Sequence, residues 1–245
     1  MADENGADRS RPELRMPKHH WIAERVSGRS FADIGGLWGA VNETVTIASH
    51  AGAREVTMID IQHEGSKWWA AFHERCAQFG VKDYGCKVAD LCDKTQLEGI
   101  GRFDFVHCSG IVYHVSDPIA FVRNLMLVAR EYLIIGSMLI PEKIENEHGV
   151  LMTPPGTFRC VPLLDEAERR IIGAHYDKLN VKVGGVNAPA PTFVDPETGR
   201  IRTGPWWHLF TGRTMEDICR LCGAEVLESS TTWQGAQNIL CRVGG

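Results

Sequence analysis

Hydrophobic and polar positions follow a strand–helix rhythm over the first 140 residues. Short apolar runs that fit strands occupy residues 30–34, 55–61, 86–91, 103–110 and 131–140. Amphipathic stretches that fit helices lie between them, at residues 41–52, 64–80 and 117–129. The last of these begins with Asp117 and Pro118, a pair typical of a helix start. This alternation predicts a parallel sheet with helices on both faces.

The rhythm changes after residue 140. From Pro141 to Pro205, Pro and Gly are frequent, and the only clear pattern is a charged helix at residues 163–176. We expect residues 141–205 to form a substrate lid inserted into the domain. The remaining elements are a helix at residues 212–224 and strands at residues 224–233 and 238–243. A short turn joins those strands, so the last one should run antiparallel. The expected fold class is α/β, with a Rossmann-like seven-stranded sheet, mostly parallel with the last strand antiparallel, plus the lid insertion.

Composition fits one soluble domain at residues 17–245, since 44% of the 245 residues are hydrophobic and 23% are charged. Residues 1–16 are polar and acidic, and we expect a disordered tail there. No apolar run reaches the length of a membrane span and no signal peptide is visible, which favours a cytoplasmic protein without a membrane partner. Of the eight cysteines, Cys219 and Cys222 form one CxxC inside a helical pattern, which favours buried thiols over zinc or redox chemistry.

The net charge and the spacing of possible metal-ligating residues restrict which partners the protein is expected to bind. The net charge is −5 and no basic stripe is present, which argues against a nucleic-acid partner. No cluster of histidines and carboxylates has metal-ligand spacing, so no metal is expected. A small-molecule partner is therefore favoured.

The loop after the first strand resembles a nucleotide-binding loop with one break in the pattern. Its sequence is SFADIGGLWGAVNE, with glycines at Gly35, Gly36 and Gly39. A dinucleotide loop needs a second spaced glycine, because a pyrophosphate must approach the backbone closely, and Leu37 stands at that position. S-adenosylmethionine has no phosphates and carries a positive sulfur, which suits Asp33 at the strand end. The loop thus favours this cofactor over the nicotinamide of an oxidoreductase, which remains an alternative.

Two further acids end the next two strands. Asp60 closes the second strand, where its carboxylate can accept the ribose hydroxyls, and Ile61 follows it in the same site. Asp90 closes the third strand and can meet the adenine amino group beside the apolar Leu91. Carboxyl ends of parallel strands lie at one edge of a sheet, so these residues and Asp33 should line one cofactor site.

These motifs together resemble the class I S-adenosylmethionine-dependent methyltransferases. The resemblance rests on DIGGLWG, MIDI, VADL and FDFVHCSGIVYHVSDP, and covers residues 30–243 apart from the insertion. It implies a seven-stranded sheet with a reversed last strand, and it implies that Cys108 and Ser109 line the methionine portion of the cofactor. The chain departs from the family at Leu37 and Trp38, where a glycine and a small residue are usual. The segments GIVYHVSDPIAFVRNL and GPWWHLFTGRTMEDICRLCGAEV look like a group with tRNA wobble-uridine carboxymethyltransferases and bacterial small-molecule and sugar methyltransferases.

Tyr113 and His114 are the catalytic candidates, because they follow the fourth strand at the edge that faces the cofactor. Methyl transfer requires alignment of the nucleophile and, for some acceptors, removal of a proton. His114 is the candidate base and Tyr113 an orienting ring, while a packing role for His114 stays open. The candidate acceptor-binding residues are Trp38, His175, Trp206, Trp207 and His208.

The hypothesis drawn from the sequence is a methyltransferase acting on oxygen, nitrogen or carbon of a small molecule, in specialised metabolism. One alternative is an RNA-modifying enzyme that transfers a methyl or carboxymethyl group to tRNA. An alternative of another class is a non-catalytic scaffold that binds the cofactor. The sequence leaves the acceptor and the oligomeric state open.

Overall fold

The structure, a computed structural model, describes residues 11–38, 43–190, 192–194, 201–203, 207–232 and 235–244. Gly39 and Trp206, both predicted for the site, lie outside these residues, as do residues 1–10 of the predicted tail. The first described helix begins at Pro17.

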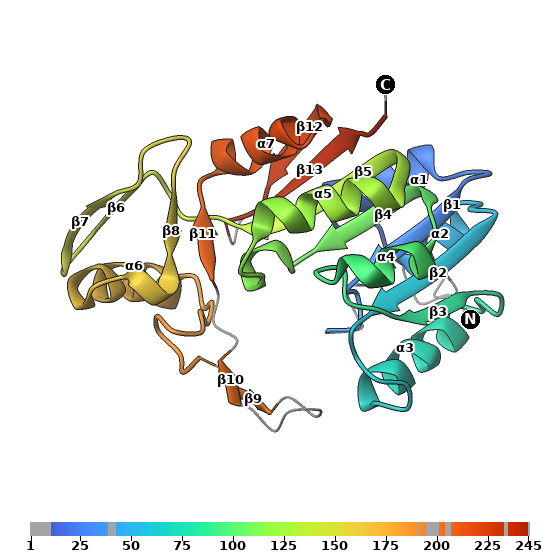
Figure 1. The fold of residues 1–245 in the computed structure, drawn as a ribbon, viewed down its shortest axis with the longest axis horizontal. Coiled ribbons are helices and arrows are strands. Elements are labelled where there is room, and N and C mark those ends of the chain that lie inside the picture. Colours follow the sequence, from blue (N-terminus) through green and yellow to red (C-terminus); the bar gives the residue numbers. More distant parts are fainter. Residues whose placement is uncertain are drawn as a thin grey trace, which may run out of the picture.

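A seven-stranded sheet forms the centre of the molecule (Figure 1). Its order is β12 (Glu225–Thr231), β13 (Ala236–Arg242), β5 (Ala129–Met138), β4 (Phe103–Ser109), β1 (Ser30–Ile34), β2 (Glu55–Asp60) and β3 (Gly85–Val88). The pairs β5–β4, β4–β1, β1–β2 and β2–β3 are all parallel, and β13 is antiparallel to both β5 and β12. The predicted α/β sheet with a reversed last strand is confirmed. Every residue of β1 is buried, as expected for a strand covered on both faces.

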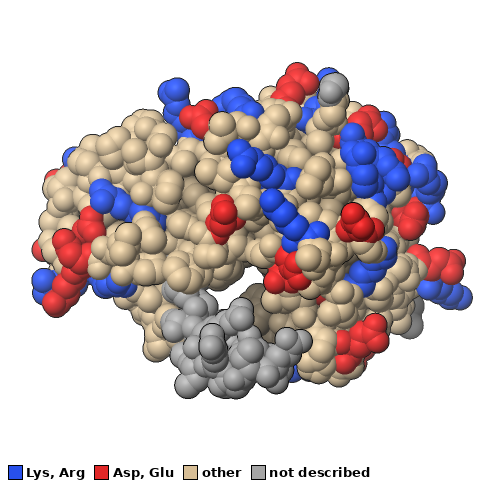
Figure 2. All heavy atoms as spheres, viewed as in Figure 1, with Lys and Arg blue, Asp and Glu red and all other residues tan. Residues whose placement is uncertain are grey.

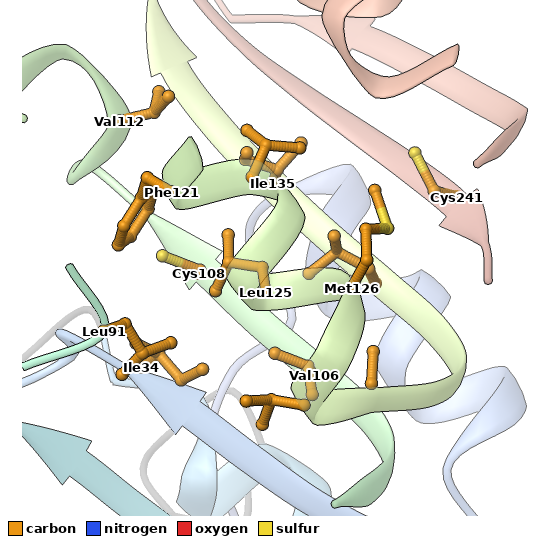
Figure 3. Close-up of a cluster of buried hydrophobic side chains, with 14 of the residues drawn as sticks. Ile34, Leu91, Val106, Cys108, Val112, Phe121, Leu125, Met126, Ile135 and Cys241 are labelled. Carbon is orange, nitrogen blue, oxygen red and sulfur yellow. The ribbon is translucent and has the colours of Figure 1, made fainter. Parts of the chain in front are cut away.

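Helices cover both faces of this sheet. One face carries α1 (Pro17–Arg25), α2 (Val45–His50) and α3 (Lys67–Gln78), and the other carries α4 (Leu97–Ile100), α5 (Pro118–Val128) and α7 (Gly212–Leu221). On the second face, Phe121 and Leu125 of α5 pack onto Cys108 and Ile135 (Figure 3). The Asp117 carboxylate accepts the Ala120 N–H, so the predicted start of α5 is correct.

The insertion contains more regular structure than the sequence predicts. Its elements are β6 (Lys143–Asn146), β7 (Gly149–Met152), β8 (Phe158–Cys160), α6 (Glu166–Lys178), β9 (Thr192–Val194) and β10 (Ile201–Thr203), followed by β11 (His208–Phe210). The predicted charged helix is present as α6, but the expectation of no other element is wrong. The strands are only three or four residues long, too short for a period of two to stand out.

The insertion folds around a hydrophobic cluster of its own, which includes Ile144, Leu151, Ile172 and Tyr176. It forms a lobe beyond the carboxyl ends of the parallel strands (Figure 1). Tyr176 Oη of the lobe donates to the Leu139 carbonyl at the end of β5, at 2.7 Å. Where the chain enters and leaves the lobe, Ile140 N–H donates to the Phe210 carbonyl at 2.8 Å. These contacts set the lobe against the edge at which α/β proteins bind ligands.

Two further observations concern possible membrane-spanning helices and the state of the cysteines. Among the helices in the described part of the chain, none has the length and apolar character needed to cross a bilayer. All eight cysteines lie within the described residues as free thiols. Cys219 is buried on α7 as predicted, whereas Cys222, just after this helix, is only half-buried.

Candidate functional site

The candidate site lies where the strand order reverses, between β1 and β4. From β1 the chain proceeds to β2 and β3 on one side, whereas β4 and β5 lie on the other. Crevices at such a reversal bind ligands in open α/β sheets. The loop after β1 starts at this point, as the sequence predicts, and Asp33 pairs in register with His107 of β4.

Leu37 directs its side chain into the core. It has no exposed surface and belongs to the cluster that α1, α2 and α3 form against the sheet. Its backbone N–H faces the Asp60 carboxylate, with 3.4 Å between N and Oδ2. The leucine that replaces the usual glycine therefore takes no space from a ligand at the loop surface.

Gly35 is required by both its backbone and its surroundings. Its φ of +75° is a conformation that residues with a side chain rarely adopt. A Cβ here would also lie 2.6 Å from Cδ1 of Ile111, which leans over the loop from the end of β4. Ile111 is a neighbour of the site that the sequence analysis did not select.

Asp60 stands at the end of β2 with its carboxylate fixed by two backbone amides. Oδ1 accepts Gln62 N–H at 3.0 Å, and Oδ2 faces Leu37 N–H. Burial raises the pKa of this carboxyl, although its backbone hydrogen bonds oppose that rise. Ile61 beside it is 65% exposed, so an apolar surface adjoins the acid at the predicted ribose position.

The other predicted cofactor residues differ in accessibility. Asp90 is exposed just beyond β3, and its Oδ1 accepts Cys92 N–H at 2.8 Å. Leu91 and Cys108 belong to the core beneath α5 (Figure 3). Ser109 ends β4 beside Gly136, where a Cβ would collide with the Ser109 hydroxyl. The close approach of these two strands leaves that hydroxyl at the carboxyl edge of the sheet.

Asp33 lies beneath the loop, fully buried. Its Oδ1 is 2.7 Å from Nδ1 of His107, and its Oδ2 accepts the Thr44 N–H at 2.6 Å. Any influence of this carboxylate on a ligand above the loop must therefore act through the loop. Lys18 on α1 completes the group, and neither it nor His107 was selected from the sequence. The one available signal was a histidine inside the apolar run of β4.

Tyr113 and His114 occupy a short 3₁₀ turn after β4, Val112–His114. Tyr113 is buried and His114 exposed, and their ring centroids lie 4.4 Å apart. Burial raises the pKa of Tyr113 to about 12, so its hydroxyl stays protonated at neutral pH. The structure thus places the predicted pair together at the edge between the sheet and the insertion lobe.

The described acceptor candidates lie in three places. Trp207 and His208 lie beside the catalytic candidates, since Trp207 N–H donates to the Tyr113 carbonyl at 2.7 Å and His208 Nε2 lies 3.3 Å from the Ser116 carbonyl. His175 is on α6, with its ring against Tyr176. Trp38 is 70% exposed on the loop after β1, and its ring packs at a tilt against Trp68 of α3, with centroids 4.8 Å apart. Trp68 of α3 thus contacts the loop that follows β1.

On the face shown in Figure 2, the surface is hollowed below its centre, between the insertion lobe and the sheet domain, which are continuous above the hollow. Lysines and arginines are mixed with acidic residues over this face and form no continuous basic stripe on it. In the described part of the chain, no group of three or more His, Cys, Asp or Glu residues could hold a metal ion.

Several solved structures share this fold. Magnesium protoporphyrin IX methyltransferase from Synechocystis PCC 6803, crystallised with SAH, matches with a TM-score of 0.55 and 15% identity, over 93% of this chain and 80% of that one. The N-terminal domain of EvdMO1, crystallised with SAH and D-fucose, matches with a TM-score of 0.52 and 16% identity, over 93% and 82%. A SAM-dependent methyltransferase from Aquifex aeolicus matches with a TM-score of 0.52 and 15% identity, over 97% and 94%.

No protein-family model matches the chain, and no curated protein sequence does so either. At the identities found, the likeness to solved structures establishes the fold. The chain has the Rossmann-like fold of class I S-adenosylmethionine-dependent methyltransferases.

Proposed function

We propose that this protein is a methyltransferase that uses S-adenosylmethionine to methylate a small molecule on oxygen, nitrogen or carbon, in specialised metabolism. The observation that carries the proposal is the first loop. Its leucine is buried, the N–H of that leucine faces the Asp60 carboxylate, and the loop lies where the strand order reverses. The solved structures that share the fold, some of them crystallised with SAM or SAH, support the choice of cofactor.

The residues present fit this cofactor. A carboxylate held at the end of β2 suits two ribose hydroxyls. A Cβ on Gly35 would lie 2.6 Å from Cδ1 of Ile111, so the glycine allows the loop and Ile111 to approach each other closely beside the proposed ligand. Asp60 and Ile61 would hold the ribose and flank the adenine, Asp90 would meet the adenine amino group, and Ser109 would face the methionine end.

When bound, S-adenosylmethionine supplies a methyl group on a positively charged sulfur. The chain must then align the acceptor and, for a hydroxyl, remove its proton. We assign the alignment to the Tyr113 ring, and proton removal to an imidazole nitrogen of the exposed His114. Trp207 and His208 flank this turn and form our proposed acceptor wall, and we interpret the insertion at 141–205 as the lid.

A small molecule is favoured over RNA because a net charge of −5 gives no general attraction to phosphates. The hollow between the lobes and the mixed charges of the face in Figure 2 agree with this choice. One protein with this fold, magnesium protoporphyrin IX methyltransferase, is named for a small-molecule substrate. Eight free cysteines favour a reducing cytoplasmic setting.

The decisive experiment is calorimetric titration of the purified protein with S-adenosylmethionine, S-adenosylhomocysteine and NAD. We expect saturable binding of the first two and none of the third. Binding of NAD alone would contradict the proposal and favour an oxidoreductase. Cofactor binding without transfer to any member of an acceptor library would favour the scaffold alternative, while RNA binding that falls steeply with salt would favour the RNA enzyme.

A further inference from the structure

Three buried polar side chains form a continuous chain from α1 to the cofactor loop. Lys18 Nζ lies 3.2 Å from His107 Nε2, and His107 Nδ1 lies 2.7 Å from Asp33 Oδ1. Lys18 is 5% exposed, His107 2% and Asp33 not at all. A lysine so deeply buried needs a reason, because taking an ammonium from water is costly unless it compensates another charge.

The hydrogen bonds determine how charge is distributed along this chain. A carboxylate only accepts, so His107 donates from Nδ1 and its Nε2 must accept from the Lys18 ammonium. The pKa of His107 is lowered by burial and then by Lys18, which keeps the imidazole neutral. Burial alone would raise the pKa of Asp33, but His107, the Thr44 amide and Lys18 together lower it. Lys18 is thus the cation that balances the Asp33 anion.

The second oxygen of Asp33 explains why this balance matters for the loop. Its Oδ2 accepts both the N–H of Thr44 at 2.6 Å and the hydroxyl of Thr44 at 3.0 Å. Thr44 is the residue that precedes α2, so one carboxylate joins the end of β1 to the start of α2, on either side of the cofactor loop. A Cβ on Gly36 would lie 2.7 Å from the same oxygen. The charge state of Asp33 therefore governs the support beneath the loop.

We propose that Lys18 is a positioning residue of the cofactor site. Through His107 it keeps the Asp33 carboxylate ionised and in place under the loop, so α1 supports that site. The proposal rests on the proposed cofactor function. Lys18 touches no ligand in this scheme and acts through the two groups beneath the loop.

Attachment of α1 to the sheet does not depend on Lys18. Trp21 Nε1 donates to Glu228 at 2.8 Å, and Arg25 pairs with the other oxygen of Glu228 at 2.6 Å. Trp21, Ile22 and Val26 also pack in the core. An apolar residue at position 18 would attach α1 to the sheet at least as well, because buried charges seldom stabilise a fold.

Few other charges act on His107. Lys18 and His19 approach it from α1 and Asp33 from β1, while Glu43, before α2, lies near Asp33 and pairs with Arg75 at 2.7 Å. Burial and the Lys18 cation lower the pKa of His19 to about 4, so it carries no charge at neutral pH. Without Lys18, His107 is the imidazole in direct contact with Asp33, and its protonation can supply the missing positive charge at that carboxylate.

This leads to a signed pH dependence in Lys18→Met. Loss of the cation raises the pKa of His107, so at low pH the imidazolium replaces the lysine and Asp33 stays seated. As the pH rises through that pKa the imidazolium loses its proton, the buried carboxylate is left without a partner charge, and cofactor affinity falls. The wild-type protein should show a much smaller fall: burial lowers the pKa of Lys18, but the Asp33 carboxylate opposes that shift and favours the charged ammonium.

The test is calorimetric titration with S-adenosylhomocysteine at pH 6 and pH 8. For Lys18→Met we expect affinity within about threefold of wild type at pH 6 and at least about tenfold weaker at pH 8, the scale of a lost charged hydrogen bond. Lys18→Gln, which keeps donors but no charge, should behave alike and replaces it if the methionine variant does not fold. In Lys18→Met/Asp33→Asn both charges are gone, so the pH dependence should disappear.

Arg25→Met is the matched control, because it removes a cation that joins α1 to the sheet without facing Asp33. It should bind as wild type does at both pH values. Equal losses at both pH values in Lys18→Met, or the same loss in Arg25→Met, would reduce Lys18 to a structural residue and overturn the inference. Wild-type protein that binds no S-adenosylhomocysteine would instead contradict the proposed function.

Discussion

Replacement of Leu37 by alanine tests the orientation of the leucine that stands at the second spaced glycine position of the loop after β1. Leu37 has no exposed surface and packs in the cluster beneath α1, α2 and α3. Leucine-to-alanine changes at such sites cost about 2–5 kcal/mol, through lost transfer energy and the cavity left behind. We expect the upper half of that range, because the surrounding strands and helices are fixed by the sheet and leave little room to collapse.

Cofactor binding should respond differently from stability in Leu37→Ala. The contact of this residue with Asp60 is made by its backbone N–H, which alanine retains. We therefore expect S-adenosylhomocysteine affinity within about threefold of wild type, measured where the variant is still folded. If the leucine instead occupied ligand space, its truncation would tighten binding.

Urea unfolding without ligand, followed by circular dichroism, measures the first quantity and calorimetry the second. Leu127→Ala is the matched control, since Leu127 on α5 is 61% exposed and its loss should change the free energy of unfolding by less than about 0.5 kcal/mol. A cost below about 1 kcal/mol for Leu37→Ala, or tighter cofactor binding, would refute the buried orientation on which the site depends.

Three further predictions concern the site. Asp60→Asn should weaken cofactor affinity by about 1.5–3 kcal/mol in calorimetry with little change in the urea midpoint, and unchanged affinity would remove Asp60 from the ribose position. His114→Ala should lower turnover of a hydroxyl acceptor by about 10²–10⁴ and leave cofactor affinity intact; full activity would return His114 to packing. Amide hydrogen exchange in the insertion at 141–205 should slow when cofactor and acceptor are both bound, whereas exchange unaffected by ligands would make it a rigid structural insertion.

The sequence by itself determined the sheet and the acids at its edge. Short apolar runs that alternate with helical segments indicated the strands of the sheet. An acid at the end of a parallel strand lies at the carboxyl edge, as Asp60 at the end of β2 shows, with Asp90 just beyond β3. The hairpin turn before β13 likewise predicted its reversed direction. These features follow from local pattern and chain direction, which need no knowledge of distant contacts.

The tertiary structure decided what local pattern cannot encode. Whether Leu37 points into the core or toward a ligand depends on the space that α2 and α3 leave beneath the loop. Lys18 and His107 are 89 positions apart, and nothing along the chain shows that packing α1 on the sheet brings them within 3.2 Å. The short strands of the insertion are held by a core of their own, which individual three- or four-residue segments are too short to reveal. Such contacts depend on how whole elements pack, because only packing makes residues distant in sequence into neighbours.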